Sequence, residues 1–225
     1  MPLQITKLSL PAVVNPLPRR LFLAAAASFL LLPAMARAAP LSPQNQALVQ
    51  RLDAYLNNQS AITAKFMQVN DDGTTRTGKA WMERPGRMRF EYDPPDPQLL
   101  VSGGTALVYH DPELNQTTNI PLASTPLGIL LAKHVSLDSN ETEITNITRQ
   151  PGEYDITLIR RGKAALGSLT LVFSTNPIEL LQWVVTDAQG RQTRVSLYDI
   201  TPTGPLPASL FQYSISAPVG HRGAE

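Results

Sequence analysis

The sequence predicts a mainly β protein with few helices, arranged as one large antiparallel sheet. After the first third of the chain, apolar residues recur at alternate positions in about ten runs, which is the spacing of half-buried strands. Turn residues such as Asp71-Asp72-Gly73 and Pro85-Gly86 separate these runs by only a few positions. Connections this short join antiparallel neighbours, because parallel strands need long crossovers.

Residues 1–38 have the pattern of a secretory signal peptide. Arg19-Arg20 precedes an apolar run at 21–32, and small residues follow up to Ala38. The run is shorter than the roughly 20 apolar residues that a membrane-spanning helix needs. We therefore expect export to the periplasm, cleavage after Ala38 and a single mature domain over 39–225. The paired arginines fit both the general and the twin-arginine export routes.

Composition argues against several classes of function. Cleavage would remove four of the 19 basic residues and none of the 18 acidic ones, leaving a formal charge of −3. A mildly acidic chain without basic clusters is a poor match for nucleic-acid binding. The absence of cysteine excludes disulfides, thiolate metal sites, cysteine nucleophiles and an anchor acylated on cysteine.

Motifs for catalysis and cofactor binding are also missing from the sequence. His110, His134 and His221 lack the spacing of metal ligands. The chain has neither a nucleophile elbow nor a glycine loop that ends in Lys-Ser/Thr. We therefore expect no metal, no cofactor and no enzymatic activity.

Two helices are expected beside the sheet. The first begins at Ser42-Pro43, a capping residue followed by proline at the first helical position, and ends near Asn57-Asn58. Its apolar residues recur at helical spacing: Leu48, Leu52, Tyr55 and Leu56. The second begins at Thr125-Pro126 and continues as a short apolar helix from Leu127 to Lys133.

The sheet raises a question about its apolar face. Strands are expected around residues 62–68, 76–84, 87–92, 99–101, 107–109, 117–120, 154–158, 169–173, 180–186, 195–197 and 210–215. A sheet of this size has one broad apolar face, which two short helices cover only in part. It therefore either closes on its own side chains or leaves a cavity for something else. Periodicity alone favours the packed core.

Several runs occur in a characteristic order in the middle of the chain. They are FMQ at 66–68, GKAWMERPGRMRFEYDPP at 78–95, QLLVSGG at 98–104 and YHDPELNQ at 109–116. In this order they resemble the LolA family, strongly from Gln44 to about Lys133 and less closely afterwards. After Phe211 to Val219, we expect no counterpart of an additional C-terminal strand that some members possess.

The resemblance implies an unclosed antiparallel half-barrel covered by a helical lid, with an apolar cavity that holds the acyl chains of lipoproteins. It implies three kinds of partner: acylated lipoproteins, an inner-membrane ABC transporter that releases lipoproteins to the carrier, and an outer-membrane acceptor lipoprotein. The carrier is expected to be a monomer. Two alternatives stay open: a carrier of another lipid, and a periplasmic domain that senses lipids or lipoproteins.

The resemblance also assigns roles to particular residues. Arg84 corresponds to the lid arginine of the family, and its five donors suit free carbonyls at the ends of lid helices. It directly precedes Pro85, which favours an extended conformation, and the alternative is a solvated arginine at a turn. The expected cavity wall comprises Phe66, Met82, Met88, Phe90, Tyr92, Leu107, Tyr109, Leu127, Leu130 and Leu131. The same side chains, and Ile129 with them, would equally suit an ordinary core.

Overall fold

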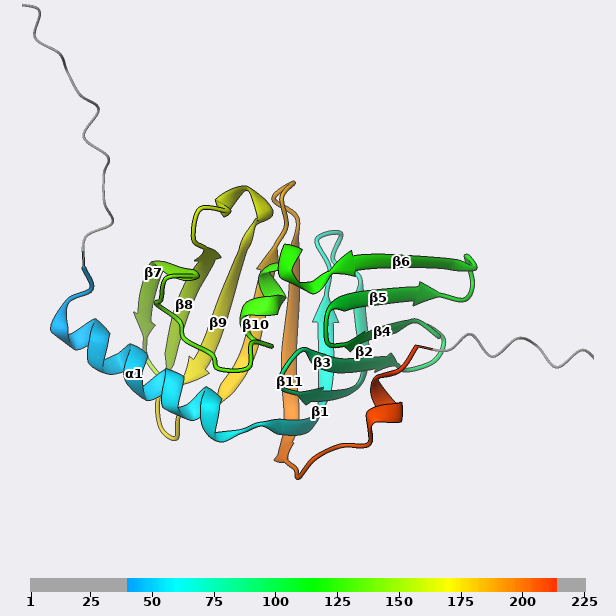
Figure 1. The fold of residues 1–225 in the computed structure, drawn as a ribbon, viewed down its shortest axis with the longest axis horizontal. Helices are drawn as coiled ribbons and strands as arrows, with labels where there is room; N and C mark the ends of the chain where they lie inside the picture. The colour runs from blue at the N-terminus through cyan, green and yellow to red at the C-terminus, as the bar shows by residue number, and fades with distance from the viewer. Residues whose placement is uncertain (1–39, 214–225) are drawn as a thin grey trace, which may run out of the picture. The chain divides into compact units, whose positions relative to one another are not determined.

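The structure, a computed structural model, describes residues 40–213; the expected signal peptide and its cleavage site lie outside them. Eleven strands form one antiparallel sheet in the order β6-β5-β4-β3-β2-β1-β11-β10-β9-β8-β7. The strands are β1 (Ala61–Val69), β2 (Thr75–Glu83), β3 (Arg87–Tyr92), β4 (Leu99–Gly103), β5 (Ala106–Asp111), β6 (Gln116–Pro121), β7 (Thr142–Gln150), β8 (Glu153–Arg160), β9 (Ser168–Ser174), β10 (Leu180–Thr186) and β11 (Gln192–Pro202). Within the described residues β6 and β7 each have one neighbour, so the sheet stays open (Figure 1). The prediction of an unclosed antiparallel half-barrel is confirmed.

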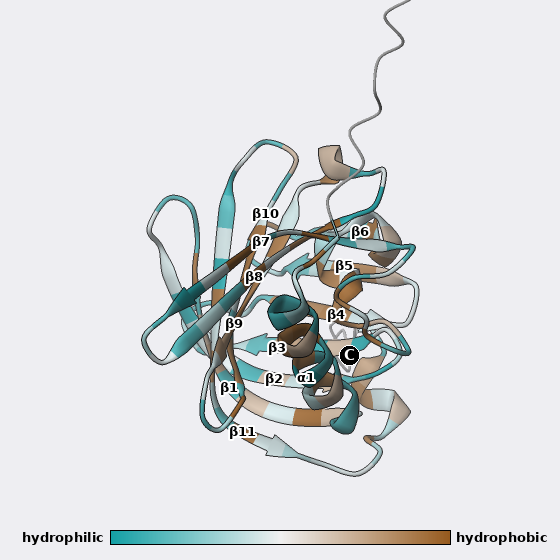
Figure 2. Ribbon diagram, turned by 90° about the vertical axis from the view of Figure 1, so that its left-hand side faces the viewer, coloured by the Kyte–Doolittle hydropathy of each residue, from teal (hydrophilic) through white to brown (hydrophobic). Residues whose placement is uncertain are grey.

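The two free edges explain why the chain covers one face of the sheet. β6 and β7 follow each other in sequence but lie at opposite edges, so the connection between them must cross the sheet. This crossover segment, residues 122–141, contains the short 3-10 helices η1 (Leu122–Ser124) and η2 (Pro126–Ile129). Helix α1 (Pro43–Asn58) lies over the same concave face (Figure 2). We call α1 and the crossover segment together the lid.

Helix α1 forms where the sequence predicts it. The Asn45 amide donates to Ser42 Oγ at 3.3 Å, and Pro43 begins the helix. Its buried residues belong to the same hydrophobic cluster as the concave face: Leu48, Val49, Leu52 and Leu56. Each buried leucine contributes roughly 1.5–3 kcal/mol, so packing rather than propensity holds the helix in place. In the described part of the chain, no helix has both the length and the apolar character needed to cross a membrane.

Aromatic side chains fill the centre of the concave face. The ring centroid of Phe66 lies 4.7 Å from that of Phe90 and 5.1 Å from that of Tyr92. Phe90 in turn makes an edge-to-face contact with Trp183 at 6.0 Å. Gly78 leaves the space for this cluster, because a Cβ there would lie 2.7 Å from the Phe66 ring. The contacts join β1, β2 and β3 to β10, and thereby link the two halves of the sheet.

The expected helix from Leu127 to Lys133 is shorter than predicted. Only Pro126–Ile129 forms a 3-10 helix, with the Leu130 amide bonded to the Leu127 carbonyl at 3.0 Å. The carbonyl of Leu131 accepts from the Gly86 amide, in the turn between β2 and β3, at 2.8 Å, instead of continuing a helix. A tertiary partner therefore ends the helix, since a segment this short is marginal on its own.

The expected strand at 210–215 is wrong in its described part. Ala208–Phe211 forms the 3-10 helix η4, and the described residues end at 213. Phe211 is buried against β3 and β4, with the Arg87 guanidinium carbon 6.0 Å from its ring centroid. Both of those strands already have two neighbours, so the segment finds no free backbone to pair with and packs through its side chains.

Strand β7 was not predicted. Its apolar residues Ile144 and Ile147 are three positions apart, which breaks the two-residue period. A bulge between Ile144 and Asn146 accommodates the extra residue, so that both isoleucines pack against the interior cluster.

Candidate functional site

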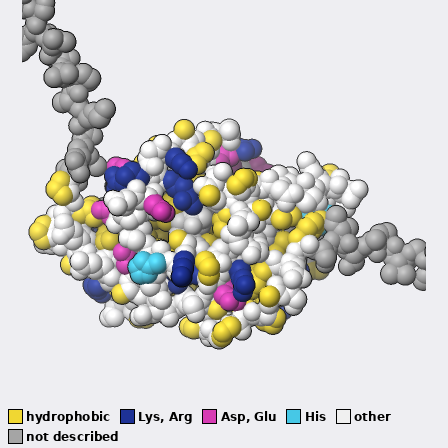
Figure 3. Space-filling model, viewed as in Figure 1, with side chains coloured by type: hydrophobic (Ala, Val, Ile, Leu, Met, Phe, Trp, Pro, Cys, Tyr) yellow, Lys and Arg dark blue, Asp and Glu magenta, His cyan; other side chains and the backbone are white. Residues whose placement is uncertain are grey.

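A small apolar cavity lies between the lid and the sheet, at the C-terminal end of α1. Its volume is about 40 Å³, and its wall consists of Tyr55, Leu56, Gln59, Ser60, Ile62, Met82, Arg84, Leu130, Leu131, Leu180, Leu197 and Ile200. One water occupies roughly 30 Å³ in the liquid, whereas pockets that enclose organic ligands measure roughly 300–1,000 Å³. The space-filling view likewise shows side chains closing this face (Figure 3). The protein's own side chains therefore fill most of the space between the end of α1 and the sheet.

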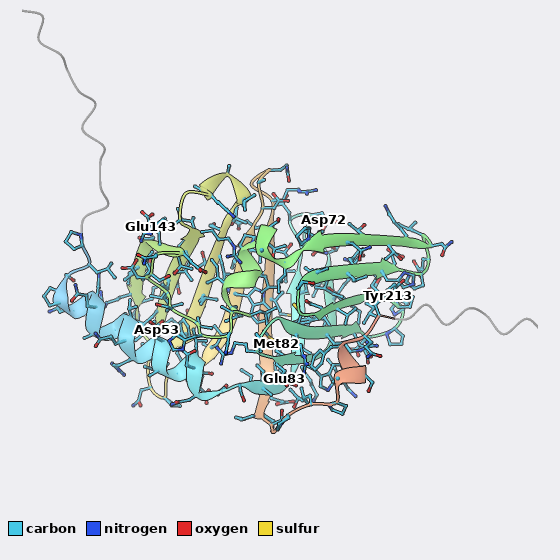
Figure 4. All side chains as sticks on the ribbon, in the orientation of Figure 1. Asp53, Asp72, Met82, Glu83, Glu143 and Tyr213 are labelled. Carbon is cyan, nitrogen blue, oxygen red and sulfur yellow. The ribbon has the colours of Figure 1, made fainter. Side chains whose placement is uncertain are left out.

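Arg84 lies at the edge of this cavity and ties α1 to the sheet. Its Nη2 atom donates to the carbonyl oxygens of Leu56 and Gln59, at the end of the helix. These are carbonyls without an intrahelical partner, which a cationic side chain satisfies well. Burial lowers the pKa of Arg84 from its ordinary value. Met82, on the strand β2 that leads into the turn carrying Arg84, lines the same cavity (Figure 4).

The turn that carries Arg84 also holds the crossover segment. The turn between β2 and β3 comprises residues 84–86, and the Gly86 amide donates to the Leu131 carbonyl at 2.8 Å. One short turn thus contacts both parts of the lid, α1 through the Arg84 side chain and the crossover segment through a backbone amide. Release of the lid at this end requires both contacts to break.

A third set of hydrogen bonds joins the two parts of the lid to each other. Asn57 pairs with the Val135 peptide twice, donating to its carbonyl at 2.7 Å and accepting from its amide at 2.9 Å. One turn earlier on α1, Asp53 Oδ1 accepts from the Leu137 amide at 3.0 Å (Figure 4). Val135 and Leu137 are fully buried. The helix and this stretch of the crossover segment are therefore coupled, and we expect them to move together.

Asp53 makes the stability of the folded protein depend on pH, and we expect the variant Asp53→Asn to show this dependence. Burial raises the pKa of Asp53 above its ordinary 3.8, with Asp138 adding to the rise, while the Leu137 amide and His134 oppose it. The folded state then binds the proton more tightly than the unfolded state, so stability falls as pH rises above 3.8. The asparagine keeps an acceptor oxygen for Leu137 without a buried charge. Thermal unfolding should show Asp53→Asn more stable than the parent at pH 7, with a smaller advantage at pH 4.

Asp72 provides the matched control with the opposite sign. Hydrogen bonds from the Thr74 hydroxyl and amide lower the pKa of Asp72, and the side chain is exposed (Figure 4). Its contribution to stability is present above its ordinary pKa and is lost as pH falls through its lowered value. Asp72→Asn should therefore lower the melting temperature slightly at pH 7. An equal shift of the same sign in both variants would contradict the burial argument.

Most of the predicted wall residues lie in one interior cluster. Buried in it are Phe66, Met82, Met88, Phe90, Leu107, Leu127, Ile129, Leu130 and Leu131, with Tyr92 partly buried against them. Burial also raises the pKa of Tyr92, whose hydroxyl donates to Gln68 Oε1 at 2.9 Å. Tyr109 does not belong to the cluster, although it pairs with Leu100 on β4. Only Met82, Leu130 and Leu131, together with Arg84, line the remaining cavity.

Sequence reasoning missed the contribution of the second half of the sheet. Leu180, Leu197 and Ile200 line the cavity, and Trp183 packs against Phe90 in the aromatic cluster. The run at 180–186 is apolar on both faces and the expected strand at 195–197 ends before Ile200, so neither pattern shows which side chains face this part of the interior. Among residues 40–213, no group of three or more histidine or acidic side chains is placed to hold a metal ion.

An open half-barrel with an apolar interior, closed by a lid that an arginine ties down, defines a class of protein that encloses apolar ligands. Residues 57–214 match the family described as outer membrane lipoprotein carrier protein LolA. The chain belongs to this family of carriers, and the resemblance predicted from the sequence is confirmed.

Individual relatives extend the match over most of the chain. An outer-membrane lipoprotein carrier protein of Pseudomonas syringae pv. syringae is 32% identical over 206 residues, which cover 87% of this chain and 94% of that protein. One of Pseudomonas paraeruginosa is 31% identical over 182 residues, covering 76% and 85% respectively. Among solved structures, a LolA superfamily protein from Nitrosomonas europaea is similar with a TM-score of 0.42 and 12% identity, covering 75% of this chain and 97% of that one.

Proposed function

We propose that this protein carries the acyl chains of lipoproteins inside the half-barrel, through the periplasm, from an inner-membrane ABC transporter to an outer-membrane acceptor lipoprotein. The observation that carries the proposal is the apolar interior beneath a lid whose helix is tied to the sheet by Arg84. The family match supports lipoproteins as the cargo. In this proposal the protein acts as a monomer and without a cofactor.

The physical need for such a carrier follows from the cost of exposing acyl chains. Each methylene group that leaves an apolar environment costs about 0.8 kcal/mol, so a chain of about 16 carbons in water costs on the order of 10 kcal/mol. A lipoprotein cannot cross an aqueous compartment at a useful rate against that cost. A protein interior that replaces the bilayer removes most of it, because the chain exchanges one apolar medium for another.

Loading requires the interior to expand. A cavity of about 40 Å³ holds no acyl chain, so the lid has to move away from the sheet before the cargo enters. Arg84 acts as the gate in this proposal: it holds α1 closed on the empty protein and lets go when acyl chains displace the helix. The affinity for acyl chains need not be large, and the direction of transfer comes from the transporter and the acceptor.

Fluorescence of Trp183 tests whether acyl chains reach the interior. The chain has two tryptophans, so Trp81→Phe leaves Trp183 as the sole emitter. A synthetic diacylated lipopeptide with brominated acyl chains should quench Trp183 strongly, because bromine quenches only in contact and Trp183 is 2% exposed beside Phe90.

The complementary variant is the control. In Trp183→Phe, the remaining Trp81 lies on the opposite side of its strand from the buried Ala80 and Met82. It should show little quenching by the same lipopeptide, and the peptide without acyl chains should quench neither variant. Equal quenching of both tryptophans, or of neither, would refute entry of the chains into the half-barrel.

A further inference from the structure

Ser102, on β4, is a polar residue buried where the concave face is otherwise apolar. It is 0% exposed, and its hydroxyl donates to the Gly86 carbonyl at 2.7 Å. The same oxygen accepts from the Gly104 amide at 3.3 Å. One hydroxyl therefore connects the turn between β2 and β3 to the turn between β4 and β5. An apolar side chain at position 102 could not make this link, whereas a hydroxyl donates and accepts through a single oxygen atom.

The two turns are in close backbone contact at this point. Gly86 has a φ of +72°, and a Cβ there would lie 2.4 Å from the Gly104 carbonyl oxygen. The conformation of Gly86 thus depends on the position of its neighbour, with Ser102 as the link between them. The amide of the same Gly86 holds the Leu131 carbonyl of the lid.

We infer that Ser102 is a positioning residue for the lid. Its buried hydroxyl fixes the turn at 84–86 so that the Arg84 contact with α1 and the Gly86 contact with Leu131 form at the same time. The inference rests on the proposed function only in that the lid opens to admit cargo. The hydroxyl of Ser102 bonds to the two turns, at Gly86 and Gly104, and it therefore acts on the lid through the turn. Its removal leaves the Gly86 carbonyl and the Gly104 amide without their buried partner, and the turn gains freedom.

Hydrogen exchange of the Gly86 amide measures this effect directly. In Ser102→Ala, protection of the Gly86 amide should fall about tenfold, because one buried hydrogen-bond partner of the turn is lost. The amides of β9 and β10 should keep their protection. A merely structural role would lower the protection of all these amides by the same factor, and that result would overturn the inference.

Two further variants complete the exchange experiment. Thr170→Ala is the matched control, since it removes a hydroxyl bonded to Thr157 at 3.0 Å in the other half of the sheet. It should leave Gly86 protected. If the two contacts form together, Arg84→Leu should itself increase exchange at Gly86. This variant tests the coupling even if Ser102→Ala does not fold. Unchanged exchange at Gly86 in Arg84→Leu would show that the contacts are independent, against the inference.

Binding of a diacylated lipopeptide supplies the second readout. A looser lid raises the population of the open form, so the apparent Kd of Ser102→Ala should fall by the same factor as the Gly86 protection. In an Arg84→Leu background, Ser102→Ala should add less than it does alone; full additivity would contradict action through one turn. If the parent bound no lipopeptide, the proposed function would fail, whereas the exchange result would still decide the role of Ser102.

Discussion

Trp183→Ala is expected to reduce the free energy of unfolding by about 3–5 kcal/mol, the range for truncating a large aromatic residue in a packed core. Trp183 is 2% exposed and packs edge to face on Phe90. Its strand pairs with β9 and β11, so its side chain fills the concave face at the centre of the second half of the sheet. Urea unfolding followed by circular dichroism measures the change.

Trp81 offers a control of identical chemistry. It is only partly buried and lies on the other face of its strand, next to Thr63 and Arg89 on the neighbouring strands. Trp81→Ala should therefore cost clearly less, about 1 kcal/mol. Similar losses for the two variants would mean that the interior of the half-barrel is not packed around Trp183.

The second large effect is expected for Arg84→Leu, which should bind a diacylated lipopeptide roughly 10- to 100-fold more tightly than the parent. A hydrogen bond to a charged group contributes about 1.5–3 kcal/mol, and the two bonds of Arg84 to the end of α1 share the one Nη2 atom, so we count them as one. Both bonds exist only while the lid is closed. Their loss shifts the balance toward the open form, and the same shift should slow release of the lipopeptide to acceptor vesicles.

Arg89→Leu is the matched control for this measurement. Arg89 also donates to a backbone carbonyl, that of Leu210 at 3.1 Å, but does so away from the lid. It should leave the affinity for lipopeptide unchanged. If Arg84→Leu bound the lipopeptide with the parental affinity, Arg84 would not control opening of the lid, whatever the effect of the substitution on stability.

The packed interior and the carrier function place opposite demands on the same side chains. In the closed form, methionine, leucine and aromatic residues bury one another, and the cavity left at the end of α1 measures about 40 Å³. Opening the lid exposes part of this surface, so acyl chains that cover it again offset the cost. Met82 and Met88 suit both situations, because methionine is flexible and adapts to different neighbours. The closed core and the cavity are in this view two states of one interior.

The amino-acid sequence by itself determined the class of fold and the surfaces that become buried. Alternation at Met88, Phe90 and Tyr92 identified the inner face of β3, and the capping pair Ser42-Pro43 located the start of α1. These features depend on neighbours within a few residues, so local patterns are sufficient to predict them. The order of runs around Arg84 was enough to identify the family.

Only the tertiary structure decided which groups meet. Arg84 reaches carbonyls 28 and 25 positions away, at Leu56 and Gln59, and the Leu131 carbonyl bonds to Gly86 rather than continuing a helix. The bulge in β7 likewise hides two inward-facing isoleucines from any two-residue period. Such contacts depend on the curvature and register accumulated over eleven strands. No local sequence pattern encodes the overall curvature and register of the sheet. These two properties bring the lid, Arg84 and the cavity to one end of the sheet.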